Sequence, residues 1–156
     1  MKRDKEFIMK KSRRMAAMSF ASMLTAGLAL PAGAATTQLP PEQTRGSVSY
    51  VSGGVGSDAA QRFEAAAPHY PLVVQLFEHA SPHAVYTAQA DVKITDLDGH
   101  VLLNQKSEGP FMLVRLPAGE YHVSASLNGH HMTARTVQVA DGGHAKATFV
   151  FPAGTG

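Results

Sequence analysis

The chain has 156 residues, with 14 lysine and arginine residues, 12 aspartate and glutamate residues and no cysteine. This length allows one domain with a single hydrophobic core. The lack of thiols excludes disulfide bonds and the cysteine that a lipoprotein needs at its cleavage site. Seven of the basic and two of the acidic residues precede Ala35, so the remainder has seven bases against ten acids, a formal net charge of −3. We therefore expect no nucleic-acid partner.

The first 34 residues have the features of a secretory signal peptide. Basic residues precede an uncharged, largely apolar run over 15–30, and the small residues of 32–34 then provide the motif that a signal peptidase needs. The run is shorter than the ~20 residues that cross a bilayer, so we expect no retained membrane anchor. Cleavage after Ala34 or Ala35 is expected to release a periplasmic or secreted protein.

The remaining residues predict an all-β protein, a single antiparallel β-sandwich of about seven strands with one short N-terminal helix. Apolar strand patterns alternate with turn signals such as Asp98-Gly99, which is typical of sandwiches. The expected segments are a signal peptide over 1–34, a flexible segment over 35–56 with a short strand at 47–51, a helix over 57–67 capped by Ser57, the sandwich over 68–152 and a tail over 153–156. Strands are predicted at 72–78, 85–87, 90–96, 101–105, 111–116, 120–127, 130–139 and 144–151.

An alternating strand that ends at Asn128-Gly129 predicts a two-residue hairpin turn, because both residues tolerate positive φ. The resulting register would pair His122 with Arg135 and would turn Val137 and Val139 toward the polar face. We therefore expect either a bulge near Arg135 or the next residue, or a longer loop. The residues predicted to be buried are Val92, Ile94, Leu116, Tyr121, Val123, Leu127 and Phe149.

The sequence Leu116-Pro117-Ala118-Gly119-Glu120-Tyr121 lies between two of the predicted strands. With its flanking strands, over Asp91 to Phe151, it resembles the carboxypeptidase regulatory-like domain, a small transthyretin-like sandwich. The resemblance implies that Pro117 ends one strand, that Gly119 supplies unusual backbone angles and that Tyr121 points inward from the next strand. It also implies an accessory module whose chemistry resides in another domain.

The segment 54–59 matches the G-x-G-x-x-A pattern of dinucleotide-binding turns, between a predicted strand and a predicted helix. Only one such unit fits before the hairpin strands begin, and the predicted helix has about three turns. A glycine-rich turn followed by a capped helix explains the same residues. We therefore expect no cofactor.

All eight histidines follow the signal peptide, which raises the hypothesis of a periplasmic copper, zinc or nickel site. The candidate ligands are His79, His83, His122 and His131. In the predicted hairpin His122 and His131 share a face but lie roughly 13 Å apart at ~3.3 Å per residue, too far to bind one ion. Ser81-Pro82 prevents a helix that would align His79 with His83.

Enzymatic motifs are missing from the sequence. It contains neither H-E-x-x-H nor G-x-S-x-G, so neither a zinc peptidase nor a serine hydrolase is predicted. Four tyrosines and no tryptophan offer few platforms for sugars. We expect a non-enzymatic exported binding module that pairs a sheet edge with another exported protein. A histidine-rich metal-binding protein is the alternative, and a carbohydrate-binding module is the third hypothesis.

Overall fold

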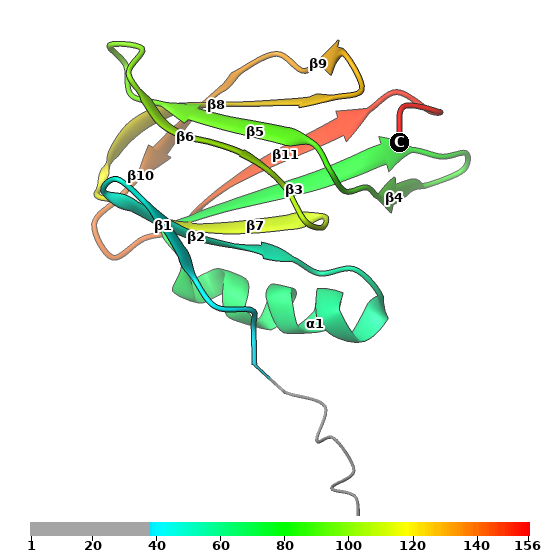
Figure 1. Ribbon diagram of the computed structural model, residues 1–156, viewed down its shortest axis with the longest axis horizontal. Coiled ribbons are helices and arrows are strands. Elements are labelled where there is room, and N and C mark those ends of the chain that lie inside the picture. Colours follow the sequence, from blue (N-terminus) through cyan, green and yellow to red (C-terminus); the bar gives the residue numbers. More distant parts are fainter. Residues whose placement is uncertain (1–37) are drawn as a thin grey trace, which may run out of the picture. The chain divides into compact units, whose positions relative to one another are not determined.

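The computed structural model describes residues 38–156, so the predicted signal peptide lies outside the described residues. Two β-sheets face each other, and a single α-helix, α1 (Ser57–Ala66), covers the outer face of one of them (Figure 1). A 3₁₀ helix (Ala67–His69) follows α1 directly. The prediction of an all-β protein with one short helix is therefore confirmed, but residues 38–156 form eleven strands and not about seven, because several short strands such as β1, β4 and β9 add to the sheets.

The larger sheet has the order β1-β2-β7-β3-β11, with β4 also paired to β3. Its strands are β1 (Gln43–Arg45), β2 (Val48–Gly53), β3 (Leu72–His79), β4 (Ala84–Tyr86), β7 (Phe111–Arg115) and β11 (Ala145–Phe151). The second sheet has the order β10-β8-β5-β6, with β9 paired to β8. Its strands are β5 (Asp91–Thr95), β6 (Val101–Lys106), β8 (Gly119–Leu127), β9 (His130–His131) and β10 (Arg135–Val139).

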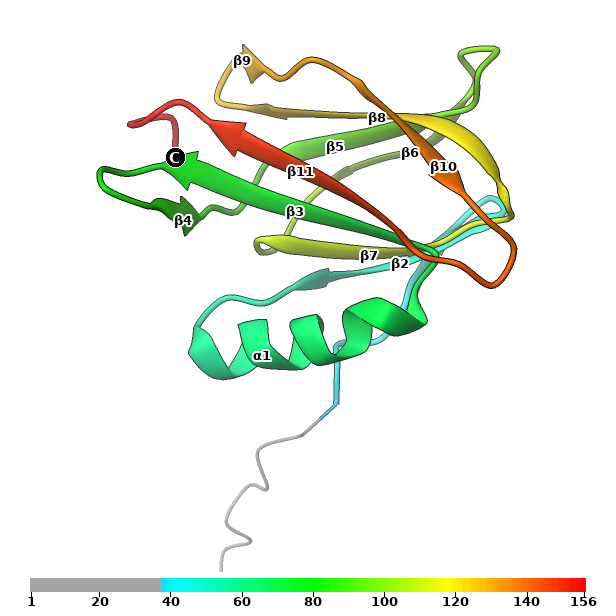
Figure 2. The same ribbon diagram turned by 180° about the vertical axis from the view of Figure 1, so that it is seen from behind.

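One strand pair departs from the antiparallel arrangement that the sequence predicted. β11 runs parallel to β3, with Ala145 opposite Leu72 and Phe151 opposite Glu78. The chain leaves β10 in the second sheet and enters the larger sheet at the end where β3 begins, where the Ala145 N–H donates to the Pro71 carbonyl. β11 therefore runs in the direction of β3 (Figure 2).

The segment 35–56, predicted to be flexible, contains more structure than expected. β1 and β2 form an antiparallel hairpin, and β2 then pairs along β7. β2 is anchored on both faces, because Tyr50 packs into the core between the sheets while Val51 packs toward α1. The predicted strand at 47–51 is thus one arm of a hairpin that belongs to the larger sheet.

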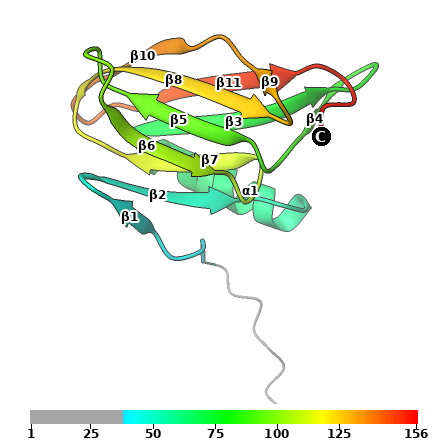
Figure 3. The same ribbon diagram turned by 45° about the horizontal axis from the view of Figure 1, so that its top comes forward.

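Two apolar clusters hold the fold together. The larger cluster lies between the sheets and includes Leu72, Val74, Leu76 and Phe149. α1 lies against the larger sheet (Figure 3). A smaller cluster fills the space between them, where Phe63 of the helix packs on Phe111 of β7 with ring centroids 5.8 Å apart. All seven residues predicted from the sequence to be buried are buried.

The hairpin after β8 resolves the conflict that its sequence predicted. Leu127 pairs with His130 across Asn128-Gly129, as expected. The Met132 N–H still donates to the Ala125 carbonyl, but the pairing resumes with Arg135 opposite Val123, so the predicted pairing of His122 with Arg135 is wrong. The inserted residue shifts the register by one and turns the apolar side chains of β10 into the core.

The loop between β7 and β8 corrects one detail of the predicted motif. Tyr121 is buried, and its hydroxyl donates to the Pro117 carbonyl over 2.8 Å. Gly119 does not have a positive φ, so it does not supply the unusual backbone angles that were expected. A Cβ at Gly119 would instead lie 3.1 Å from the Tyr121 hydroxyl, which accounts for the small residue.

Candidate functional site

The strongest candidate for a binding site is a groove beside β4. It has a volume of about 330 Å³ and is lined by 54–57, Ala60, 86–88 and Pro110. Val55 and Tyr86 on its walls are 68% and 42% exposed. Large apolar side chains that remain exposed together are typical of interaction surfaces. We call this feature the β4 groove.

The hydrogen bonds of β4 show which of its backbone groups face the groove side. The Thr87 N–H donates to the Leu76 carbonyl, and the Ala80 N–H donates to the His83 carbonyl. The pair Glu78 and Val85 lies between these two bonded pairs. In an antiparallel ladder every second pair of opposite residues exchanges two hydrogen bonds, so Glu78 and Val85 are bonded to each other as well. By alternation, the N–H and C=O groups of Ala84 and Tyr86 point away from β3.

Tyr86 joins the two walls of the β4 groove. Its ring stacks on Phe77 with centroids 4.8 Å apart and lies 5.1 Å from the ring of Phe111. Its hydroxyl donates to Glu64 of α1 over 2.6 Å. Burial, together with the hydrogen bond to the Glu64 carboxylate, raises the pKa of Tyr86 to about 12. The exposed ring is therefore held in a fixed position.

The glycine-rich segment 54–59 forms the opposite wall of the groove and the start of α1. Gly54 has φ +93°, and a Cβ there would lie 2.5 Å from the Phe111 ring. The N-cap is Gly56, not Ser57, since the Ala60 N–H donates to the Gly56 carbonyl and the Ser57 hydroxyl contacts Asp58 instead. The predicted Ser57 cap is thus corrected: the glycines shape a turn around Phe111.

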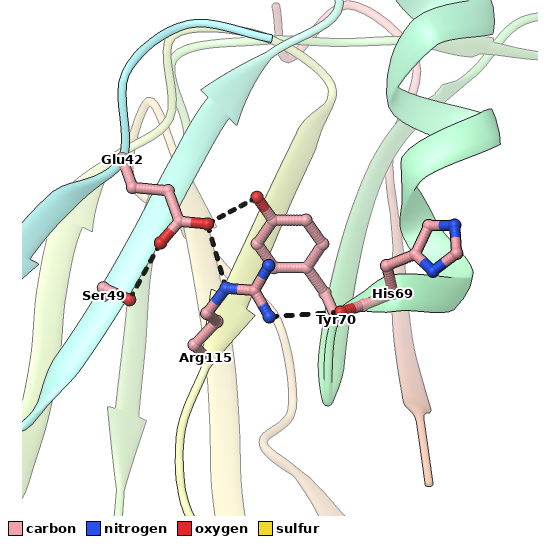
Figure 4. A network of polar contacts seen from close by, with 5 residues as sticks. All are labelled: Glu42, Ser49, His69, Tyr70 and Arg115. Carbon is pink, nitrogen blue, oxygen red and sulfur yellow. Dashed lines mark hydrogen bonds and ion pairs between the residues drawn. The ribbon is translucent and has the colours of Figure 1, made fainter. Parts of the chain in front are cut away.

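A polar network at the other end of the larger sheet is the second arrangement with notable chemistry (Figure 4). One Glu42 oxygen accepts hydrogen bonds from the Tyr70 hydroxyl over 2.7 Å and from Arg115 Nε over 2.9 Å. The guanidinium lies 4.2 Å above the Tyr70 ring, and its Nη1 donates to the His69 carbonyl. The remaining Glu42 oxygen accepts from Ser49.

These contacts shift the titration of all three ionisable groups. The Tyr70 hydroxyl and then Arg115 lower the pKa of Glu42. Burial raises the pKa of Tyr70, and the hydrogen bond to Glu42 raises the pKa of Arg115. The charges of the network compensate each other, so we interpret it as a brace that fastens the segment before β1 to β7 and the 3₁₀ helix.

The four histidines considered as metal ligands lie at three places, because His79 and His83 share the hairpin between β3 and β4. His79 ends β3 and His83 precedes β4. On the second sheet, His122 contacts the Thr136 hydroxyl over 3.1 Å, while His131 lies opposite Ser126 at the far end of β8. None of the four is in a group of three potential ligands in the part of the chain that the structure describes.

The one such group among residues 38–156 is Asp96, Asp98 and His100, whose ligand atoms lie within 4.8 Å of one another in the turn between β5 and β6. His100 Nδ1 contacts Asp96 over 2.9 Å. Desolvation opposes the shift, but the hydrogen bonds from His100 lower the pKa of Asp96. Sequence reasoning missed this group, although the spacing Asp-x-Asp-x-His within a turn was a signal for it.

Comparison of the chain with protein-family models, curated proteins and solved structures finds no match. Across residues 38–156, no helix has the length and apolar character needed to span a membrane. The functional inference therefore depends on the groove, the network and the turn described above. Of these, the β4 groove alone combines a concave shape with exposed apolar walls.

Proposed function

We propose that the protein is a non-enzymatic, exported binding module that contacts another exported protein through the β4 groove. The observation that carries the proposal is the exposure of Val55 and Tyr86 around one apolar concavity. Burial of apolar surface drives most protein association, at roughly 25 cal/mol per Å² removed from water. The sequence features of a signal peptide support export, and the resemblance of 91–151 to a carboxypeptidase regulatory-like domain supports an accessory role.

Site-specific photo-crosslinking in the producing cells tests this function. Val55 is replaced by p-benzoylphenylalanine, and Val101, a 54% exposed valine on β6 of the other sheet, is replaced in a matched control. We expect a discrete adduct from position 55 and none from position 101, both recovered from the extracytoplasmic fraction. Equal labelling at the two positions, or no adduct at all, would contradict the proposal.

Export is tested separately by N-terminal sequencing of the recovered protein. The predicted cleavage after Ala34 or Ala35 gives a mature chain that begins at Ala35 or Thr36. A protein that retains Met1 in the cytoplasm would contradict the exported role and would leave the groove without the proposed partner class.

A divalent-cation site is the second candidate function, and the Asp96, Asp98 and His100 group is the observation that favours it. Two carboxylates and one imidazole suit zinc or nickel. Titration calorimetry with Zn(II) is expected to give one site in the parent that the Asp98→Asn variant weakens at least about tenfold, or about 1.4 kcal/mol. Unchanged binding in that variant would exclude this group as the site.

The carbohydrate hypothesis has less support from the geometry. Three of the four tyrosines, Tyr50, Tyr70 and Tyr121, are buried. Only Tyr86 presents an exposed ring, and it belongs to the apolar β4 groove. A sugar platform would need aromatic rings on an exposed polar surface, so the protein-binding function is preferred.

A further inference from the structure

We infer that the β4 groove takes an extended peptide segment of the partner, which adds a strand to the free edge of β4 and places an apolar side chain, flanked by lysine or arginine, in the groove. This inference rests on the proposed binding function and specifies its ligand class. Strand addition obtains affinity from backbone hydrogen bonds and specificity from side-chain pockets. Three features of the site support it: its place in the sheet, its backbone polarity and its charge.

The place in the sheet follows from the partners of β3. β11 pairs along one edge of β3 from Leu72 to Glu78. A strand has two edges, so β7 and β4 share the other, with β7 opposite 72–75 and β4 opposite 77–79. Beyond β7 lies β2, whereas within residues 38–156 no second strand pairs with β4. The sheet thus lacks a strand next to β4, in line with β2.

The chain itself keeps this position open. β2 ends at Gly53 opposite Phe111, and the following glycines turn the chain away into α1 (Figure 1). The β4 groove lies between that turn and β4. The backbone groups of Ala84 and Tyr86 point away from β3 toward this side, so they supply two donors and two acceptors at the spacing of a β-ladder. An extended segment matches that pattern.

The charge around the groove defines the residues that flank the apolar side chain. Ser57, Ala60 and Glu64 lie on one side of α1, and Glu64 is hydrogen-bonded to Tyr86 on the groove wall. Asp58 and Arg62, four residues apart in α1, share a different side of the helix. Arg62 lines a different concavity, together with Ala59 and Phe63. The charged residue on the groove side of the helix is therefore Glu64, whose carboxylate complements lysine or arginine in the partner.

Peptide selection followed by amide exchange tests the inference. The protein purified from the extracytoplasmic fraction is used to select from a phage-displayed library of random linear dodecapeptides. We expect enriched sequences with an apolar residue next to lysine or arginine. A synthetic peptide of the enriched sequence should slow hydrogen exchange at the Ala84 and Tyr86 amides at least about tenfold. The Val85 amide, already bonded to Glu78, should change much less.

Two controls separate backbone pairing from side-chain contact. The same peptide with alternate backbone nitrogens methylated keeps its side chains but loses its ladder donors, and it should bind at least about tenfold more weakly. Val55→Lys, at an exposed position, should weaken binding through lost apolar contact and added positive charge. Val101→Lys on β6 adds the same charge far from the groove and should leave binding unchanged.

The outcomes distinguish this inference from the function on which it rests. An adduct at position 55 without protection of the Ala84 and Tyr86 amides would retain the binding function and overturn strand addition. Failure to enrich any peptide, enrichment of acidic peptides, or full binding by the methylated peptide would also overturn it. If sedimentation shows self-association and the same amides are protected in the self-associated protein, the strand on β4 comes from a second copy of this chain. That outcome would also overturn the inference of a partner peptide.

Discussion

The two faces of the larger sheet are built from the same strands but are covered to different extents. On one face, Leu72, Val74 and Leu76 of β3 pack against the second sheet and are fully buried. The opposite face is covered by α1 at Val73, while Phe77 at the far end remains half-buried beside the exposed Tyr86. The covered face supplies stability, and the partly covered face leaves apolar surface for a partner.

Alternation along a single strand produces this division. Successive residues of β3 point to opposite faces, so each half of its side chains serves a different cluster. The inter-sheet cluster joins residues from both sheets, whereas the α1 cluster depends on one helix and a few side chains, chiefly Phe63, Phe111 and Val73. Mutations in the two clusters should therefore differ in how far they lower the free energy of unfolding and in how many elements lose protection from hydrogen exchange.

The largest effect is expected at the centre of the inter-sheet cluster. Phe149 is fully buried on β11, so Phe149→Ala removes a large ring and leaves a cavity. The free energy of unfolding should fall by about 3–5 kcal/mol, measured by urea denaturation. Val150→Ala on the same strand, at a 40% exposed position, should change it by less than about 0.5 kcal/mol. Equal effects in the two variants would contradict the assignment of faces.

A smaller and more local effect is expected on the α1 face. Phe63→Ala removes the helix side chain that packs on Phe111, at a cost of about 3 kcal/mol, the lower end for such a truncation. Because α1 contacts the sheet on one side only, its amides should exchange faster while those of β8 keep their protection. Gln61→Ala, at an exposed position of α1, is the matched control. Equal loss of protection in α1 and β8 would contradict this expectation, because it would mean that the two faces unfold as one cooperative unit.

The sequence is informative where one local pattern decides the structure. Alternation over 121–127 and the Asn128-Gly129 turn predicted the hairpin, and the polar position of Val137 and Val139 in that register predicted the bulge. Burial of Phe149 followed from the same alternation. In each case one face of a strand is apolar, so a wrong register would expose it to water.

The remaining features depend on residues that are distant in the sequence. No local pattern indicates that β11 runs parallel to β3, because the direction follows from where the chain crosses between the sheets. The β4 groove joins 54–57, 86–88 and Pro110, and its apolar character became apparent only when Val55 and Tyr86 were placed together. The candidate histidine ligands form no group of three within residues 38–156, because His79 and His83 share one hairpin of the larger sheet while His122 and His131 lie on the second sheet.

The brace at the opposite end of the larger sheet should contribute less than either cluster. Glu42 and Arg115 are 35% and 46% exposed, so solvent screens their pairing and Glu42→Gln should cost at most about 1 kcal/mol. The folded state lowers the pKa of Glu42. Its contribution is therefore fully present above the ordinary pKa near 4.5 and is lost as the pH falls through the lower folded-state value.

Chemical denaturation of parent and variant across the acid range measures this contribution. The difference in unfolding free energy between parent and Glu42→Gln should be constant near neutrality and vanish as acid protonates Glu42. Glu120→Gln, at an exposed position of β8, should show no such convergence. A difference that persists in strong acid would mean that Glu42 acts through packing and not through its charge.

The smallest effect is expected for the pKa of Tyr86, on the partly covered face of the larger sheet. The pKa of Tyr86 is raised to about 12, first by burial and then by the Glu64 hydrogen bond. Glu64→Gln should bring it part of the way back toward 10, because the variant removes the carboxylate but leaves the ring stacked on Phe77. Tyrosine ¹³Cζ shifts followed through the alkaline range measure the change.

A raised tyrosine pKa has a defined consequence for stability. The contribution of the Tyr86 hydroxyl is fully present below its ordinary pKa of 10 and is lost as the pH rises through about 12. A peptide strand on β4 would cover the ring further, and the added desolvation would move this loss to higher pH. If bound peptide left the Tyr86 titration unchanged, the ring would not belong to the binding wall, and the distinction between the two faces would rest on Val55 alone.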